Sequence, residues 1–329
     1  MTQFQTAQET TAGTRKGIKV KMGHVSAPPL YVVVTPARNE EAFIEKTIES
    51  IIRQTARPLK WVIVNDGSTD ATGSIAEKYA ARHDWIEVVT LPTHRDRSFA
   101  GKVHAFNAGF DRVKHLNYEV IANLDSDISF DADYFEFLLS KFRENPKLGV
   151  AGTIFESEGY SSAMDSFEGQ NHVAGGCQLF RKGCFEEIGG YVPNKGGGID
   201  WIAVTTARMM GWKTRSYREK SFYHYRHLGT AERSFFAAAF AYGHKDYCMG
   251  AHPVWQLFRV TYRMTKRPYF VEGFALGLGY TWAMVRRAKH PISKELIAFY
   301  RGEQMQKLST ILKSVLTFKK VDKFNVLPE

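Results

Sequence analysis

The segment VIVNDGSTD at Val62–Asp70, together with VIANLDSD at Val120–Asp127, decides the fold of this chain. Each is an apolar run that ends abruptly in carboxylates. Such runs are typical of buried strands in a parallel sheet, and ligands of such sheets bind at the carboxyl ends of the strands. We therefore expect Asp66, Asp125 and Asp127 to meet in one crevice.

Strand-like and helix-like segments alternate through the first part of the chain. Short apolar runs are separated by segments whose apolar residues recur at helical spacing. We expect strands at 31–35, 61–65, 86–90 and 119–124, and helices at 41–55, 71–82 and 101–114. This alternation predicts an α/β fold with a Rossmann-like, mainly parallel sheet flanked by helices. Neither a G-x-G-x-x-G nor a P-loop motif occurs, which argues against a dehydrogenase or a P-loop nucleotidase.

Composition indicates a globular protein with an anionic partner. The 329 residues are 44% hydrophobic, and 44 Lys and Arg against 34 Asp and Glu give a formal net charge of +10. A nucleotide, an anionic membrane surface or a nucleic acid would suit that charge, but no zinc-finger or RNP motif supports nucleic acid. The three cysteines form no disulfide framework or zinc pattern, so we expect reduced thiols in a cytoplasmic protein.

The chain divides into three parts. Residues 1–29 are polar, lack the apolar core of a signal peptide and are expected to form a flexible tail. Residues 30–230 carry the α/β pattern, which becomes rich in glycine pairs after Gly152. Residues 231–329 are mostly helical in pattern and rich in Phe, Tyr, Arg and Lys. We therefore expect an α/β domain with a mostly helical C-terminal extension.

One stretch of the extension raises the question of a membrane. Tyr269–Val285 is largely apolar, but it contains Glu272 and its length is at the short limit of the roughly 17–25 residues that span a bilayer. Basic residues flank it on both sides, so it is not expected to span. Two interpretations stay open: a segment on an anionic membrane surface, at the cytoplasmic face of the cell membrane, or a buried helix.

The acidic step at the end of the fourth predicted strand offers metal ligands. Asp125 and Asp127 supply hard oxygen atoms of the kind that bind Mg²⁺ or Mn²⁺, and a cation held there would suit a nucleotide diphosphate. A plain turn is the alternative. Arg95 and Arg97, just ahead of a predicted helix, could face the phosphates of the same ligand.

Four motifs in order carry a resemblance to a known family. They read VVVTPARNEE from Val32, VIVNDGSTDAT from Val62, GKVHAFNAGF from Gly101 and LDSD from Leu124. With these motifs the chain resembles the inverting glycosyltransferases of family 2, which have the GT-A fold, over about residues 31–226. The last hundred residues more loosely resemble bacterial enzymes that assemble cell-surface polysaccharides.

The resemblance implies a donor-binding role for residues after the first two strands. Pro36, Arg38 and Glu40 would lie in the loop against the nucleotide base, although that loop could instead only connect strand and helix. Asp66 would accept an N–H of the base, which favours UDP, while an Asx turn is its alternative. Lys102, at the start of a helix, would lie near the ribose or phosphates, and otherwise it is a solvated lysine.

The resemblance also implies metal ligands. Asp127 would coordinate the cation, and Asp125 would reach the ribose or the metal. His224 would be a further ligand, since it fits the family spacing better than His227, but a histidine among aromatic residues is more often packed.

Asp200 is the candidate catalytic base of an inverting transfer. The family usually has Glu-Asp at this position, whereas this chain has Ile199 before Asp200, and a plain helix N-cap is the alternative. Glu186 and Glu187 are the substitutes for this role. The pair Gly175-Gly176 is expected to shape the acceptor side or to be a simple turn.

The predicted function is an inverting, metal-dependent glycosyltransferase. It would move a sugar from a nucleoside-diphosphate donor to a hydroxyl of a glycan, or of a polyprenyl-linked glycan, in polysaccharide biosynthesis. One alternative is a non-catalytic homologue that acts as a glycan- or membrane-associated subunit. Another is a sugar-nucleotide pyrophosphorylase, but the segment from Thr35 to Glu40 lacks the glycine- and lysine-rich phosphate loop of that class.

Overall fold

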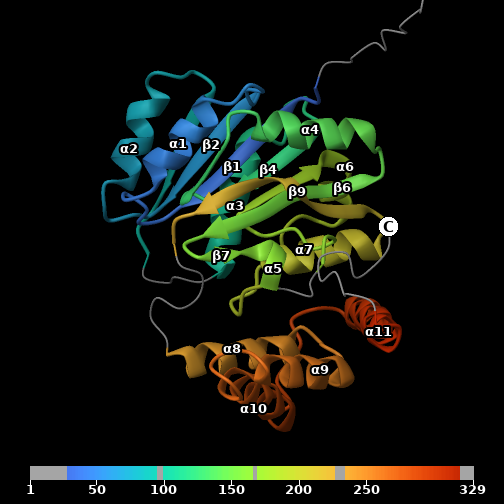
Figure 1. The fold of residues 1–329 in the computed structure, drawn as a ribbon. Helices are drawn as coiled ribbons and strands as arrows, with labels where there is room; N and C mark the ends of the chain where they lie inside the picture. The colour runs from blue at the N-terminus through green and yellow to red at the C-terminus, as the bar shows by residue number, and fades with distance from the viewer. Residues whose placement is uncertain (1–27, 95–98, 166–168, 227–233, 319–329) are drawn as a thin grey trace, which may run out of the picture.

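The fold is described from a computed structural model that covers residues 28–94, 99–165, 169–226 and 234–318 (Figure 1). Most of the predicted N-terminal tail lies outside these ranges, and so does the predicted boundary between residues 230 and 231. The described chain has two layers in space: an α/β sheet domain and, below it in Figure 1, a group of C-terminal helices.

The sheet has nine strands in the order β3-β2-β1-β4-β8-β6-β9-β5, with β7 paired to β6. Neighbours are parallel from β3 to β4 and between β6 and β9, whereas β8, β5 and β7 run antiparallel to their neighbours. The parallel arrangement therefore holds for the N-terminal half, and the later half is mixed. The strands are β1 (Tyr31–Ala37), β2 (Lys60–Asp66), β3 (Ile86–Leu91), β4 (Val120–Leu124), β5 (Ile128–Phe130), β6 (Leu148–Ser157), β7 (Tyr160–Ser161), β8 (Cys177–Arg181) and β9 (Lys213–His224).

Helices cover both faces of the sheet because successive strand residues point to opposite sides. Val33 and Ile63 pack in one core cluster with α1, α2 and α4. Val32 and Val62 pack in a second cluster with α3, α6 and α7. The predicted α/β fold is confirmed. The helices are α1 (Ile44–Ile52), α2 (Thr72–Ala80), α3 (Phe99–Val113), α4 (Tyr134–Glu144), α5 (Ser162–Asp165), α6 (Lys182–Glu187) and α7 (Ile199–Met209).

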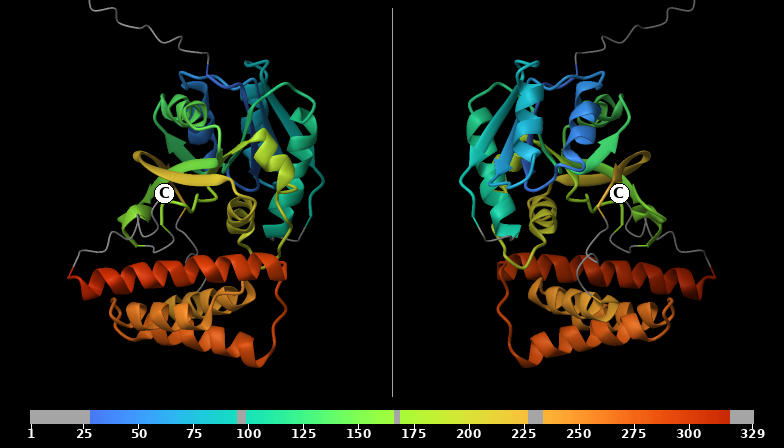
Figure 2. Two further views of the ribbon diagram at one scale, coloured as in Figure 1. Left: turned by 90° about the vertical axis from the view of Figure 1, so that its right-hand side faces the viewer. Right: turned by 90° about the vertical axis from the view of Figure 1, so that its left-hand side faces the viewer.

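The C-terminal helices form a layer on the α7 side of the sheet domain (Figures 1 and 2). Trp201 of α7 packs edge-on against Tyr300 with the ring centroids 4.5 Å apart, and the guanidinium of Arg208 binds both carboxylate oxygens of Glu303 at 2.7 and 2.9 Å. These contacts attach α11 to the sheet domain. The layer consists of α8 (Phe235–Cys248), α9 (Pro253–Met264), α10 (Val271–Val285) and α11 (Lys294–Leu316).

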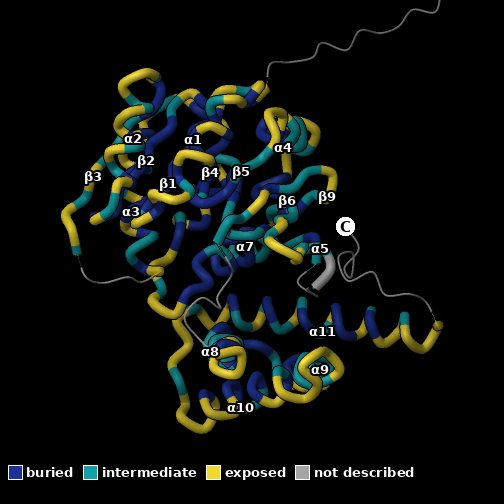
Figure 3. The backbone as a smooth tube through the Cα atoms, turned by 60° about the vertical axis from the view of Figure 1, so that its left-hand side comes forward, coloured by how far each residue is buried: buried dark blue, intermediate teal, exposed yellow. Residues whose placement is uncertain are grey.

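Helices α8 and α10 pack at very short range. A Cβ added at Gly243 would lie 1.9 Å from the carbonyl oxygen of Leu276, and one added at Gly279 would lie 2.0 Å from that of Phe240. Only glycine allows this approach. The opposite side of α10 is exposed to solvent (Figure 3). Within the described ranges, no helix combines the length and the apolar character that crossing a bilayer requires.

The three cysteines are free thiols, in line with the expectation from sequence. Cys177 and Cys184 are buried, and burial raises the pKa of each thiol to about 12. Both are therefore protonated at neutral pH and have structural rather than chemical roles.

Candidate functional site

The predicted carboxylates lie at one edge of the sheet. Asp66 ends β2, Asp125 follows β4 and Asp127 precedes β5, so all three lie beyond the carboxyl ends of neighbouring or linked strands. Backbone hydrogen bonds hold the Asp-Ser-Asp step in place. The amide of Asp125 donates to the carbonyl of Gly176 at 2.8 Å, and the amide of Tyr225 donates to the carbonyl of Asp127 at 2.9 Å.

The structure gathers Asp125, Asp127 and His224 into one cluster, which we call the acidic site. Their ligand atoms all lie within 4.8 Å of one another. The Nδ1 of His224 lies 2.7 Å from the carbonyl oxygen of Arg226, so we assign the proton to Nδ1, which donates to that carbonyl. Nε2 then presents a lone pair toward Asp127, whose Oδ1 is 3.7 Å away.

This donor set fits a divalent cation. A second hydrogen bond that fixes the imidazole is the usual companion of a metal-binding histidine. Burial, and then the neighbouring carboxylate of Asp125, raise the pKa of Asp127, although His224, Arg226 and Lys102 act in the opposite direction. A cation between the two carboxylates would remove that repulsion. Two carboxylates and one imidazole suit Mn²⁺, and the carboxylates alone suit Mg²⁺.

Two cationic side chains border the acidic site. The ammonium of Lys102 donates to Asp125. Burial alone would lower the pKa of Lys102, but Asp125, with Asp200 and Asp127 further away, outweighs it and raises that pKa. Arg226 forms an ion pair with Glu40 at 2.7 Å, and its Nε lies 3.7 Å from Asp127. The carboxylate of Glu40 is thus held by Arg226 beside the acidic site.

Asp200 lies in the first turn of α7 with its carboxylate against the glycine turn. A Cβ added at Gly175 would lie 2.9 Å from Oδ2 of Asp200. The N-cap of α7 is Gly198, with φ +77°, and no side chain caps the helix, so the interpretation of Asp200 as a plain N-cap is wrong. Asp200 instead points toward Gly175 and contributes to the raised pKa of Lys102.

The substitutes for Asp200 lie elsewhere. Glu187 accepts a hydrogen bond from the indole of Trp212 at 2.7 Å and is exposed. Glu186 belongs to the same short helix, α6, and its charge acts on Tyr118, which precedes the amino end of β4. Neither carboxylate is at the edge of the sheet where Asp125 lies.

Two of the predicted nucleotide-base residues, Arg38 and Asp66, form a second group with His94 beyond β1 and β2, whereas Glu40 lies with Arg226 beside the acidic site. The guanidinium of Arg38 lies 3.2 Å from Nδ1 of His94, and Nε2 of that histidine lies 2.9 Å from Oδ1 of Asp66. Pro36 stays within β1 and accepts a long hydrogen bond, 3.5 Å, from the hydroxyl of Ser126. The side chain that stabilises the turn after β2 is that of Asp70, which accepts a hydrogen bond from the amide of Thr72 at 3.0 Å.

Sequence reasoning missed two residues of these groups, His94 and Arg226. Each had a signal. His94 lies three residues after β3, beyond the carboxyl end of the strand next to β2, which ends at Asp66. Arg226 is two residues after His224, and residues two apart on an extended chain share a face. Three further candidates, Arg95, Arg97 and His227, lie outside the described residues.

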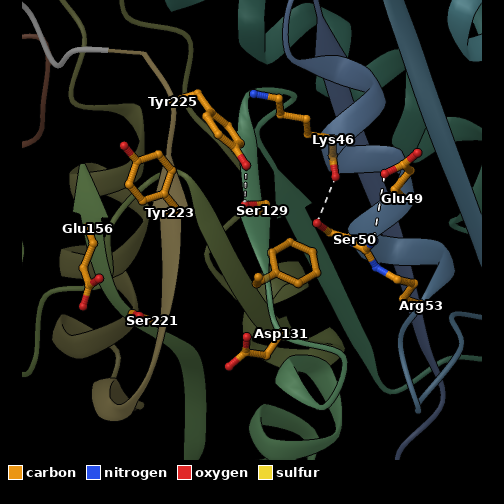
Figure 4. Close-up of a pocket in the computed structure, with 11 residues that line it drawn as sticks. Lys46, Glu49, Ser50, Arg53, Ser129, Asp131, Glu156, Ser221, Tyr223 and Tyr225 are labelled. Carbon is orange, nitrogen blue, oxygen red and sulfur yellow. Dashed lines mark hydrogen bonds and ion pairs between the residues drawn. The ribbon is translucent and has the colours of Figure 1, made fainter. Parts of the chain in front are cut away.

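The opposite face of β9 lines a separate pocket of about 380 Å³ (Figure 4). Tyr223 and Tyr225 alternate with His224 and line this pocket, while His224 faces the acidic site. The hydroxyl of Tyr225 is 2.9 Å from that of Ser129, and the ammonium of Lys46 lies 4.1 Å from the centroid of the Tyr225 ring. One strand therefore serves both the acidic site and the pocket behind it.

Residues 32–166 match the sequence model of the family described as "Glycosyl transferase family 2". This range contains the loop after β1, the end of β2 and the Asp-Ser-Asp step. The matched residues, 135 of the 329 in the chain, are similar to a family 2 glycosyltransferase domain. His224, Arg226 and Asp200 lie outside the matched range, although the fold brings them to the same edge of the sheet.

Curated relatives that this chain matches include a bacterial polysaccharide synthase and a putative glycosyltransferase. A poly-beta-1,6-N-acetyl-D-glucosamine synthase of Staphylococcus epidermidis is 28% identical over an alignment of 171 positions that covers 46% of this chain and 39% of that protein. The putative glycosyltransferase EpsH of Bacillus subtilis is 30% identical over 168 residues, 51% of this chain and 46% of EpsH. The matches thus span less than half the length of either relative.

Solved structures share the fold over most of the chain. A mannosyltransferase, PcManGT from Pyrobaculum calidifontis, in complex with GDP-Man and Mn²⁺, matches with a TM-score of 0.52 and 19% identity, over 89% of this chain and 84% of that one. Staphylococcus aureus TarS 1-349 in complex with UDP-GlcNAc matches with a TM-score of 0.51 and 14% identity, over 90% of this chain and 89% of that one. The predicted GT-A fold is confirmed.

Proposed function

We propose that this chain is an inverting, metal-dependent glycosyltransferase that moves a sugar from a nucleoside-diphosphate donor to a hydroxyl of a glycan acceptor in polysaccharide biosynthesis. The observation that carries the proposal is the acidic site, because Asp125, Asp127 and His224 gather at the ligand-binding edge of a domain similar to those of family 2. Lys102 and Asp200 lie close enough to act on the same charges.

The donor side has a division of roles. Asp125, Asp127 and His224 would hold Mn²⁺ or Mg²⁺, which as a Lewis acid would stabilise the departing nucleoside diphosphate. Lys102 would bind a phosphate or ribose oxygen from the start of α3. Asp66, oriented by His94, would accept the N–H of the base, and Arg38 behind His94 would fix this arrangement. Proteins of the same fold that bind UDP-GlcNAc and GDP-Man support this donor class, and Asp66 favours UDP.

Asp200 would be the catalytic base. Asp200 lies in the first turn of α7, and its carboxylate would accept the proton of the acceptor hydroxyl. That oxygen attacks the anomeric carbon from the face opposite the leaving group, so an α-linked donor gives a β-linked product. Gly175, which has no side chain, leaves the space beside the carboxylate open.

A thermal-shift panel of UDP, GDP, dTDP and CDP, each with and without Mn²⁺, tests the donor site. A ligand that binds the folded state raises its stability according to concentration over Kd. We expect one nucleotide to raise the Tm only with Mn²⁺, and Asp127→Ala to abolish that rise. If no nucleotide shifts the wild-type protein under any condition, the donor site is wrong and the fold serves a non-catalytic role.

The C-terminal layer would bring the enzyme to an anionic membrane surface. Along α10 and its N-cap, Phe270, Phe274, Leu278 and Trp282 recur every four residues and are all exposed, Phe270 at 70% and Trp282 at 50%. Exposed basic residues bracket this stripe at both ends: Lys266, Arg267, Arg286 and Arg287. An apolar stripe between cations matches an interface with anionic headgroups. We call these four apolar residues the α10 stripe.

A further inference from the structure

A pocket of about 530 Å³ lies between the C-terminal layer and the sheet domain. It is enclosed by one face of α8, the first residue of α3, the loop before α7 and the segment after α10. Its lining combines three lysines with large apolar side chains: Lys195, Lys245, Lys289, Phe99, Phe240 and Met249. The pocket belongs to neither the acidic site nor the pocket behind β9.

The positive charge of this pocket is not balanced by a carboxylate among its lining residues. The three lysines form no ion pair with any carboxylate of the described ranges. Elsewhere in the same layer, basic residues are paired: Arg259 with Asp246 at 2.7 Å and Arg263 with Glu272 at 3.2 Å. Three cations around one concave space attract an anion, and an ammonium group binds phosphate oxygens as a point charge.

The pocket adjoins the loop that positions Asp200. A Cβ added at Gly198 would lie 3.2 Å from Cε of Lys245, and one added at Gly197 would lie 3.0 Å from the ring of Phe99. Gly198 is the N-cap of α7 and is two residues before Asp200. A ligand in this pocket therefore lies beside the N-cap of α7, two residues before Asp200 in the sequence.

Apolar surface continues from the pocket along α8. Phe240 lines the pocket, and Phe236, one helical turn before it, is exposed. A ligand with an anionic group at the lysines would thus have an apolar surface for an attached hydrocarbon chain. The phosphates of the donor are not expected to bind these lysines. In the proposed function, Lys102 and the acidic site bind the donor phosphates at the edge of the sheet.

We propose that this pocket binds the phosphate or diphosphate group of the acceptor, so that the acceptor is a lipid-linked saccharide. This inference rests on the proposed function and names its acceptor class. Lys195, Lys245 and Lys289 bind the anion, Phe99 and Phe240 contact the first part of the lipid chain, and the sugar hydroxyl reaches Asp200.

Binding of farnesyl diphosphate to the full chain in EDTA tests the proposal, with farnesol and inorganic pyrophosphate as comparison probes. EDTA removes the cation that the donor site requires. We expect farnesyl diphosphate to bind more tightly than either comparison probe. Lys245→Gln with Lys289→Gln should raise its Kd by about 10-fold or more, since each lysine makes a charge-assisted contact. Lys195→Gln, in an exposed loop, should weaken binding without any folding defect.

Two controls separate the outcomes. Lys147→Gln with Lys213→Gln removes two exposed lysines outside the pocket and should leave the Kd unchanged. The Mn²⁺-dependent nucleotide shift should persist in the lysine variants, so failure of the pocket and failure of the donor site are distinguishable. Equal binding by wild type and pocket variants overturns the proposal. Loss of binding in Asp127→Ala alone assigns the probe to the donor site and overturns it as well. If the pocket variants lose only binding to phosphatidylglycerol vesicles, the ligand is a bilayer headgroup and not the acceptor.

Discussion

The carboxyl edge of the sheet and the C-terminal layer differ in which side chains they bury and which they expose. At the edge, charges are partly buried and paired, Lys102 with Asp125 and Arg226 with Glu40, and the carboxylate of Asp66 lies 2.9 Å from Nε2 of His94. The layer buries glycines and leaves the aromatic residues of the α10 stripe exposed. Burying a charge costs free energy unless a partner is present. Partly buried carboxylates at this edge are therefore expected to bind a cationic ligand. The exposed aromatic surface of the α10 stripe is instead expected to contact a membrane surface.

The largest expected effect is at Asp200. Asp200→Asn removes the proton acceptor and keeps the shape of the side chain, so we expect turnover to fall by about 10²- to 10⁴-fold. The Mn²⁺-dependent nucleotide shift should stay, because the donor site is intact. Initial rates of nucleoside diphosphate release with an added acceptor measure the change. A variant with near wild-type rates would show that another group takes the proton.

Loss of Asp127 should affect binding and turnover together. Asp127→Asn removes a buried anionic ligand from the acidic site, and we expect kcat to fall by about 10²- to 10³-fold, as for other removed electrostatic groups. The nucleotide shift with Mn²⁺ should also disappear. Asp111→Asn, an exposed carboxylate on α3, is the matched control and should behave as wild type. If the nucleotide still raised the Tm of Asp127→Asn only with Mn²⁺, the metal would bind outside the acidic site.

In the C-terminal layer, we expect substitutions to change stability through helix packing rather than through charge. Gly279→Ala places a methyl group on the carbonyl of Phe240, and we expect the free energy of unfolding to fall by about 1–3 kcal/mol. Gly277→Ala on the same helix meets only Val260, at 3.5 Å, and should raise stability by about 0.5–1 kcal/mol through helix propensity. Urea unfolding of both variants provides the comparison. Similar stability changes in the two would mean that α8 and α10 do not pack this closely.

The smallest effect should be at the surface of the layer. Phe274→Ser with Trp282→Ser removes apolar area from the α10 stripe without touching the core, so affinity for phosphatidylglycerol vesicles should fall by about 10-fold. Stability should be unchanged. Leu30→Ser with Leu59→Ser removes exposed apolar residues of the sheet domain and is the control. Equal sedimentation of both variants with vesicles would exclude the stripe as the contact.

The two regions also differ in what their sequence reveals. Asp66 and Asp125 follow apolar runs, and the strand-end rule alone predicts their shared edge. His224 was a candidate through the family resemblance alone, because the pairing of β5 with β9 that brings it and Arg226 to this edge is a long-range contact: residues 131–212 separate the two strands.

Asp200 and the α10 stripe show the limits of local pattern in another way. Strand β8 inserts antiparallel beside β4, and the glycine turn before it contacts both sides of the site: the carbonyl of Gly176 accepts from the amide of Asp125, and Gly175 lies against the carboxylate of Asp200. The apolar stretch Tyr269–Val285 contains α10, but the sequence left open whether it is a membrane-surface segment or a buried helix, and periodicity could not decide which side is buried. That decision rests on Gly243 and Gly279, whose contacts exist only in three dimensions.

Anomalous diffraction from a crystal of the full chain grown with Mn²⁺ and UDP tests the central claim most directly. The account predicts a manganese peak within coordination distance of Asp125, Asp127 and His224, with the nucleotide diphosphate beside it and the base near Asp66. A nucleotide bound elsewhere, or a peak that avoids the acidic site, would contradict the account.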